Sequence, residues 1–201
     1  MYKPVYSLPQ LIFFVLALVL TGCIPIAINP TSSPTPSTPI WIAKWLDHPD
    51  CFPPCWENIQ PGTTTVGSIQ TTLAQYGPNI DIVTKPGSTV VQSVRLFFSL
   101  HENLPLSLLI SKYGIPDYVR ISLCDSTLNC DVHVLFIKIG MVLSLYTSEI
   151  GEWAIKDRVV ISSNTRVIQI YFLEPGLEKY YNLYPADSHQ VTPWNGYKEY
   201  P

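Results

Sequence analysis

The stretch VHVLFIKIGMVLSLY, residues 132–146, is the part of the sequence that decides the fold class. It contains two runs of mostly β-branched and other apolar residues, Val132–Ile137 and Met141–Tyr146, with a break at Gly140 between them. Runs of this composition, bounded by glycine, predict β-strands. Because Gly, Asn and Asp separate these runs and others like them, we expect an antiparallel sheet.

Other strand patterns lie on both sides of this stretch. They cover residues 80–84, 89–99, 118–123 and 167–172, with a further candidate within 153–161. Two helix patterns interrupt them, at residues 62–78 and 103–117, and a short third helix is predicted at 176–184. The first two helices each present one apolar face, and both end at Tyr-Gly followed closely by proline.

The order of these elements predicts an α+β domain. Its antiparallel sheet is expected to carry the helices on one face. Since each of the first two helices is followed by strands, we also predict two helix-then-strands repeats, at residues 56–100 and 102–173.

The first 23 residues are organised like a bacterial export signal. Lys3 is their only charged side chain, and the apolar run Leu11–Leu20 follows it. This run is about half the ~20 residues that a membrane-spanning helix needs, and it has the length of a signal-peptide core. Leu20-Thr21-Gly22-Cys23 then resembles the lipobox of bacterial lipoproteins, in which the cysteine thiol accepts lipid.

We therefore predict a signal peptide over residues 1–22 and lipidation at Cys23. Acyl chains on Cys23 would anchor the mature protein on the extracytoplasmic side of a bacterial membrane. The alternative is an uncleaved N-terminal anchor helix with an incidental cysteine. Residues 23–40 are rich in Pro, Ser and Thr and predict an extended linker, so the globular domain is expected at 41–201.

Four further cysteines form two close pairs in the sequence. An exported protein meets an oxidising environment, which favours disulfides. Of the three possible connectivities we favour the local one, Cys51 with Cys55 and Cys124 with Cys130. A metal site built from His48, Cys51 and Cys55 is the alternative, but no second His/Cys pair follows at zinc-ribbon distance.

A weaker resemblance covers residues 51–172. Pro61-Gly62-Thr63-Thr64, which opens a helix closed by Gly and Pro, resembles the start of the module in BamE/SmpA-type envelope lipoproteins. The apparent doubling is similar to the tandem fold of β-lactamase inhibitor proteins, and Pro54-Cys55-Trp56 looks like the opening of uncharacterised lipoproteins from filamentous green bacteria. The resemblance implies a non-catalytic module that binds other envelope proteins.

The sequence contains few motifs that indicate a catalytic, cofactor-binding or metal-binding site. It has no Gly-rich phosphate loop, no G-x-S-x-G and no H-E-x-x-H, and we predict no cofactor and no metal. Asp131 and His133 are the best acid-base pair because they share one face of a strand, although a solvent-facing polar edge explains them more simply. Carboxylates near Trp153, at Glu149, Glu152 and Asp157, allow a glycan cleft, although isolated surface charges explain them as well.

Aromatic residues are concentrated near the C-terminus. Trp153, Trp194 and Tyr197 are candidate ligand contacts, whereas Tyr180, Tyr181 and Tyr184 are expected to seal the sheet. A net charge of −3, with 13% charged residues, gives no reason to expect nucleic acid. We predict a membrane-tethered, non-enzymatic module that contacts another envelope protein. The alternatives are a glycan- or small-ligand-binding module and, third, an envelope hydrolase acting through Asp131 and His133.

Replacing Cys23 with Ala is expected to release the protein from membranes, because the variant lacks the thiol that accepts lipid. Fractionation of cells into membrane and soluble material measures this directly, with Cys51→Ala as a control that keeps the anchor. A Cys23→Ala variant that stays with the membrane would disprove lipid anchoring at this residue.

Overall fold

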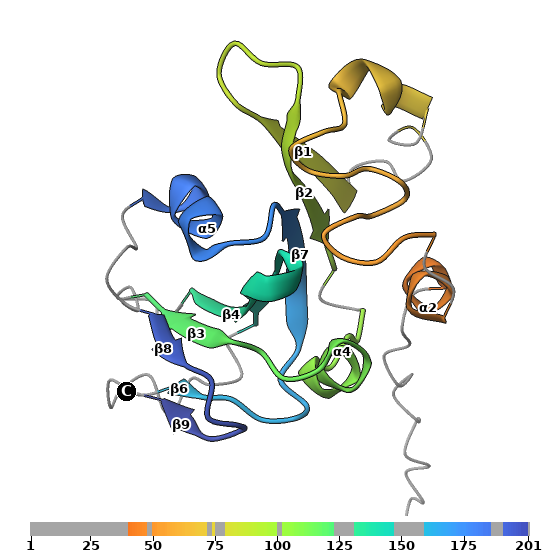
Figure 1. Ribbon diagram of the computed structural model, residues 1–201. Helices are drawn as coiled ribbons and strands as arrows, with labels where there is room; N and C mark the ends of the chain where they lie inside the picture. The colour runs from red at the N-terminus through yellow and green to blue at the C-terminus, as the bar shows by residue number, and fades with distance from the viewer. Residues whose placement is uncertain are drawn as a thin grey trace, which may run out of the picture. The chain divides into compact units, whose positions relative to one another are not determined.

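The apolar runs of the sequence form one antiparallel sheet of seven strands, in the order β1-β2-β7-β5-β4-β3-β8 (Figure 1). Its strands are β1 (Ile80–Thr84), β2 (Val91–Phe97), β3 (Tyr118–Ile121), β4 (Val132–Phe136), β5 (Met141–Leu145), β7 (Val167–Leu173) and β8 (Val191–Pro193). A separate two-stranded sheet pairs β6 (Val159–Val160) with β9 (Glu199–Tyr200). The predicted antiparallel sheet is confirmed.

This computed structural model describes residues 40–47, 50–71, 74, 79–99, 102–122, 131–146, 159–185 and 191–200. The chain divides into two units, Met1–Thr35 and Pro36–Pro201, and all described residues belong to the second. The predicted signal peptide, Cys23 and almost all of the linker lie outside the described residues. None of the helices in the described ranges is long and apolar enough to cross a membrane.

Three α-helices and two 3₁₀ turns accompany the sheet in the described ranges, which makes the domain α+β. They are α2 (Ile40–Asp47), η1 (Val66–Ser68), α4 (Leu106–Tyr113), η3 (Ile137–Ile139) and α5 (Leu177–Leu183). Helix α4 begins after Pro105 and ends at Gly114, whose φ of 88° suits glycine. The sequence predicted α4 and α5 but not α2.

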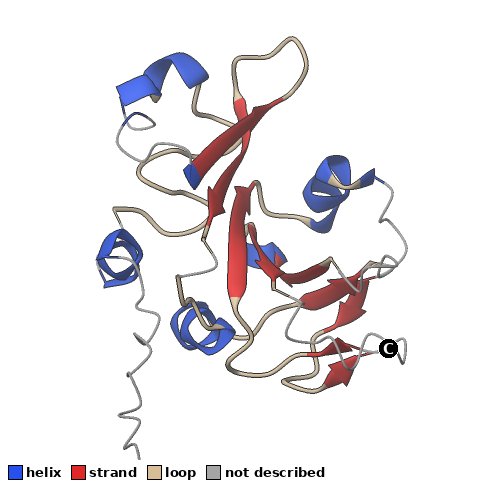
Figure 2. Cartoon of the chain, turned by 180° about the vertical axis from the view of Figure 1, so that it is seen from behind, coloured by secondary structure: helices blue, strands red, loops and turns tan. Residues whose placement is uncertain are grey.

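Helices pack on both faces of the sheet, so the prediction that they share one face is wrong. Leu143 and Phe172 point to one face and belong to the same buried cluster as Trp45 of α2 and Leu109 of α4. The neighbouring strand residues Val142 and Tyr171 point the other way, and with them pack residues of α5. Both views show α5 on one side of β7 and the other two α-helices on the opposite side (Figure 2).

The predicted duplication is not confirmed. The first unit contributes the hairpin β1–β2, whereas the second contributes β3, β4, β5 and β7. Strand β2 pairs with β7 of the second unit, so the two units share one continuous sheet. In the first predicted helix, η1, residues 70–71 and residue 74 are helical, while Gly77 and Pro78 lie outside the described residues.

Gly140 occupies a tight turn of the sheet, between η3 and β5. Its φ is +63°, and a Cβ added here would lie 2.1 Å from the carbonyl oxygen of Leu173 and 2.9 Å from Cβ of Pro54. The amide of Leu173 also donates a 2.9 Å hydrogen bond to the carbonyl of Gly140. A side chain at this position would therefore separate β7 and the loop around Pro54 from the turn.

Gly140→Ala is expected to destabilise the protein by at least about 2 kcal/mol, because it combines left-handed backbone with a steric clash against backbone. Gly87→Ala is a matched control, since its φ is +74° but nothing lies within 4 Å of an added Cβ. That variant should lose only about 1 kcal/mol. Urea unfolding measures both, and equal losses would show that the contact at Gly140 is unimportant.

Candidate functional site

A polar cluster lies between the sheet and α5, formed by His133, Asp131, Arg120 and Tyr180, and is called the His133 cluster below. Nε2 of His133 lies 3.1 Å from Oδ1 of Asp131, and Nη1 of Arg120 donates to Oδ2 of Asp131 at 3.1 Å. Nδ1 of His133 lies 2.8 Å from the hydroxyl of Tyr180 and 3.3 Å from Nη1 of Arg120. The strand register creates this proximity, since Arg120 on β3 is paired with His133 on β4.

The prediction that Asp131 and His133 share a face is correct, but the simpler interpretation as a solvent-facing edge is wrong. Strand β4 is paired on both sides, and the side chain of His133 is only 1% exposed. The side chain of Arg120 is 4% exposed and that of Asp131 is 48% exposed. Asp131 therefore links two buried basic groups to the surface.

The hydrogen bonds of the His133 cluster occupy both ring nitrogens of His133. A carboxylate only accepts, so Nε2–H donates to Asp131. Arg120 only donates, so Nδ1 is an acceptor. Ser144 lies opposite His133 in the register of β4 and β5, yet both nitrogens of the imidazole already contact other groups. A serine nucleophile would need one of them as its base.

Tyrosines of α5 and of its C-terminal end pack on the sheet, as the sequence predicted, and they do so over His133. The ring of Tyr184 packs edge-on against His133 with centroids 4.9 Å apart, and Tyr180 is fully buried. Burial and a hydrogen bond with Tyr171 raise the pKa of Tyr184 above its ordinary value. Tyr181 packs against the same cluster of apolar residues. Together these contacts fix α5 to the sheet.

A second aromatic group lies at the C-terminal end of the described chain. Trp194 packs edge-on against Tyr197 at 5.8 Å and stacks on Tyr200 at 6.0 Å. Tyr200 is buried and its hydroxyl donates to the carbonyl of Gly196, while Tyr197 is 41% exposed. The structure thus brings together Trp194 and Tyr197 of the three predicted contact aromatics. Trp153, Glu149, Glu152 and Asp157 lie outside the described residues.

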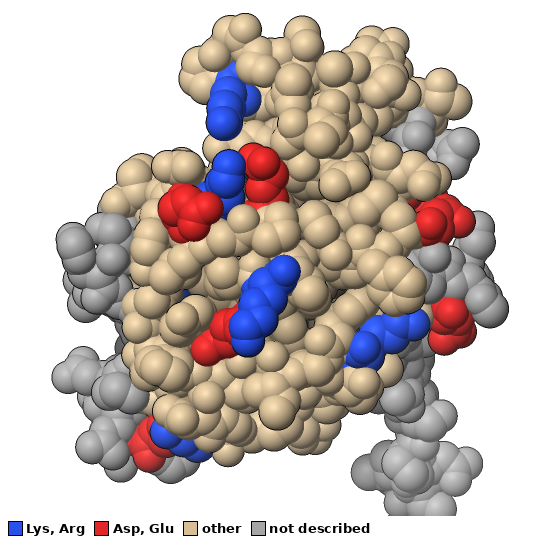
Figure 3. All heavy atoms as spheres, in the orientation of Figure 1, with Lys and Arg blue, Asp and Glu red and all other residues tan. Residues whose placement is uncertain are grey.

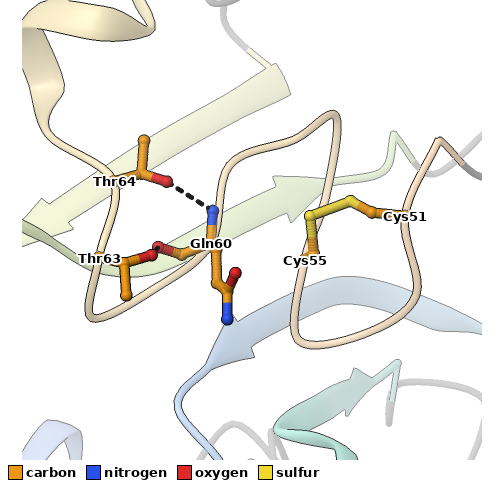
Figure 4. Close-up of a disulfide and its surroundings, with 5 residues drawn as sticks. All are labelled: Cys51, Cys55, Gln60, Thr63 and Thr64. Carbon is orange, nitrogen blue, oxygen red and sulfur yellow. Dashed lines mark hydrogen bonds between the residues drawn. A yellow bond between two sulfur atoms is a disulfide. The ribbon is translucent and has the colours of Figure 1, made fainter.

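A disulfide-closed loop follows α2. Cys51 and Cys55 are joined, with Cα atoms 5.6 Å apart (Figure 4), which confirms the first predicted pair. The bonded sulfurs of Cys51 and Cys55 are not free thiolates for a metal, so the alternative site with His48 loses two of its three ligands. No group of three or more metal-ligating side chains occurs in the described parts of the chain. Cys124 and Cys130 lie outside them.

The loop rests on two turns that sequence patterns did not reveal. Trp56 and Ile59 exchange backbone hydrogen bonds of 3.0 and 2.7 Å around Glu57 and Asn58, which both have positive φ as in a type I′ turn. The Glu-Asn pair was the available signal, since Asn favours this conformation. In the next turn the hydroxyl of Thr64 accepts from the amide of Gln60 at 2.8 Å (Figure 4).

At its tip the loop exposes a large aromatic residue. Phe52 is 72% exposed, although Trp56 and Ile59 at the base of the loop are 0% and 1% exposed. The amide of Cys55 donates to the carbonyl of Phe52 at 3.0 Å, and a cis peptide bond joins Pro53 to Pro54. No sequence pattern distinguishes Phe52 from a buried aromatic residue, because its exposure depends on how the loop packs.

Comparisons with protein-family models, with curated proteins and with solved structures gave no match. The resemblance of residues 51–172 to BamE/SmpA-type lipoproteins therefore stays a prediction.

Asp131 is expected to make the free energy of unfolding depend on pH in the acid range. Burial opposes ionisation of its carboxyl group, but hydrogen bonds from His133 and Arg120 and the positive charge of Arg120 outweigh this, so the pKa of Asp131 lies below its ordinary value. A carboxylate with a lowered folded pKa contributes stability above its unfolded pKa and loses it as pH falls.

Asp131→Asn should therefore lower stability by about 1–2 kcal/mol near neutral pH, after allowance for the half-exposed carboxylate. The difference from the wild-type protein should shrink below about pH 4. Urea unfolding across this range measures it. Asp81→Asn, which removes an exposed partner 3.7 Å from Arg95, is the control and should change stability by less than about 0.5 kcal/mol. A pH-independent difference for Asp131→Asn would contradict the assignment.

Proposed function

We propose that this protein is a lipid-anchored envelope lipoprotein whose folded domain is a non-catalytic module that binds another protein. The observation that carries this proposal is the placement of exposed apolar side chains. Phe52 and Ile115 are 72% and 79% exposed, and each lies on a loop beside a helix of the domain. Loops fixed by a scaffold are a common place for binding residues. The lipobox-like sequence at Cys23 supports the location.

The state of the best acid-base pair also supports a non-catalytic role. In the His133 cluster both imidazole nitrogens are engaged, and the ring is buried under α5. These contacts explain why a histidine lies in the centre of a sheet without invoking a reaction. An envelope hydrolase acting through Asp131 and His133 is therefore the least favoured function, and unchanged activity in His133→Ala would remove it.

A glycan-binding module is the second candidate, and the pair Trp194–Tyr197 favours it. A half-exposed tyrosine edge-on to a tryptophan offers ring surface on which a sugar can pack. Tyr197→Ala should then abolish binding on a glycan array, with Tyr181→Ala as a control on α5. The two-repeat organisation and the BamE/SmpA-like module belong to the leading proposal, since they imply contact with envelope proteins.

The leading proposal predicts that the full-length lipoprotein, cross-linked in intact envelopes, recovers a specific protein. Because the partner would share the membrane surface, Cys23→Ala should reduce the recovery at least about tenfold. Affinity purification followed by mass spectrometry measures it, and Glu178→Lys, an exposed change on α5, is a control that keeps the anchor. Recovery of no protein above background, or equal recovery with Cys23→Ala, would contradict the proposal.

A further inference from the structure

We infer that the disulfide-closed loop Cys51–Cys55 is the docking element of this domain, and that Phe52 enters an apolar pocket bordered by Lys or Arg on a partner protein. This inference rests on the proposed function and names the partner's chemistry. It begins from a contrast, since Phe52 is 72% exposed although the loop that carries it is firmly anchored.

Three sets of contacts hold the loop in place. The disulfide closes it, and the amide of Cys55 donates to the carbonyl of Phe52. Below it, Trp56 is fully buried and is paired with Ile59 in a two-residue turn. At its side, Pro54 lies so close to Gly140 that no Cβ fits between them.

A large apolar side chain on such a loop is preorganised for binding, because the loop is already ordered. Ordering a flexible segment is one of the main costs of association, and here the ring closure and the two prolines have already restricted the backbone. Aromatic residues, Phe included, are also enriched in the cores of protein interfaces. Phe52 therefore has both the chemistry and the support of an interface anchor.

The charge around the loop indicates what lies opposite it. The exposed residues Asp47 and Asp50 precede the loop and Glu57 follows it, and residues 45–84 contain no Lys or Arg. Asp81, on β1, is paired with Arg95. Asp50 is exposed two residues before Phe52. On the face shown in Figure 3, no lysine or arginine is visible over the orange and gold segments at the upper right of Figure 1. Lys112 of α4 contacts α2, where its ammonium donates to the carbonyl of Leu46.

The negative charge near the loop favours a protein partner over a lipid surface. Bacterial membranes present anionic headgroups, and a peripheral protein normally inserts aromatic residues next to Lys and Arg. An aromatic side chain that closely follows two exposed carboxylates, Asp47 and Asp50, would be disfavoured there. The same carboxylates would attract a pocket with a basic rim and exclude acidic partners.

Site-specific photo-cross-linking in cells of the native host tests the inference. Benzoylphenylalanine is placed at Phe52, or at Ile115 as a control of similar exposure, in the full-length lipoprotein. We expect a protein adduct from position 52 at a yield at least fivefold above that from position 115. The cross-linked peptide of the partner should contain apolar residues next to Lys or Arg.

A charge-reversal variant forms the second part of the cross-linking experiment. Asp50→Lys in the position-52 background should lower the adduct yield at least fivefold, whereas Glu178→Lys on α5 should leave it unchanged. Both side chains are exposed, so both variants should keep the wild-type unfolding midpoint. Adducts with lipid or with a second copy of this chain, no adduct, a yield no higher than at position 115, or insensitivity to Asp50→Lys would overturn the inference.

Cross-linkers at further positions distinguish failure of this inference from failure of the proposed function. Leu108 and Tyr197 are 38% and 41% exposed and accept the same probe. Protein adducts from position 108, 115 or 197 but not from 52 would overturn the docking role of Phe52 and leave the interaction module standing. No protein adduct from any of the four positions would overturn both.

Discussion

Strands β4 and β5 bury every residue along their length, on both faces of the sheet. A strand of this kind needs a covering layer on each side, because exposing either face would return apolar surface to water at about 25 cal/mol per Å². Helices α2 and α4 supply one layer and α5 the other. The rest of the domain follows from this requirement, including the polar contacts that fix α5 over a histidine.

The features of the fold that the sequence predicts are those set by residues close together in the chain. Strand β1 has the predicted bounds, and most other strands differ from theirs by one or a few residues, because β-branched runs and glycines are local signals. The two-sided position of the helices was missed. His133 was interpreted as polar alternation, although VHVLF is otherwise a continuous apolar run of the type found in strands buried on both faces.

Long-range pairing explains most of the other differences. Nothing local in β2 indicates that its partner is β7, more than 70 residues later, and this pairing is the reason that two expected repeats share one sheet. In the His133 cluster, Asp131 and His133 share a face by simple alternation, which sequence revealed. Arg120 and Tyr180 reach them through strand register and helix docking, which sequence did not reveal.

The short helix α2 also has a mechanical consequence. It is the first described element of the domain, so a pull on the preceding chain reaches the fold through α2. Among the contacts that resist that load are the hydrogen bond from Lys112 to the last turn of α2 and the packing of Trp45 against Phe172. Both lie on the face opposite α5. A pull on the preceding chain would therefore reach α2 before it reaches the sheet or the histidine beneath α5.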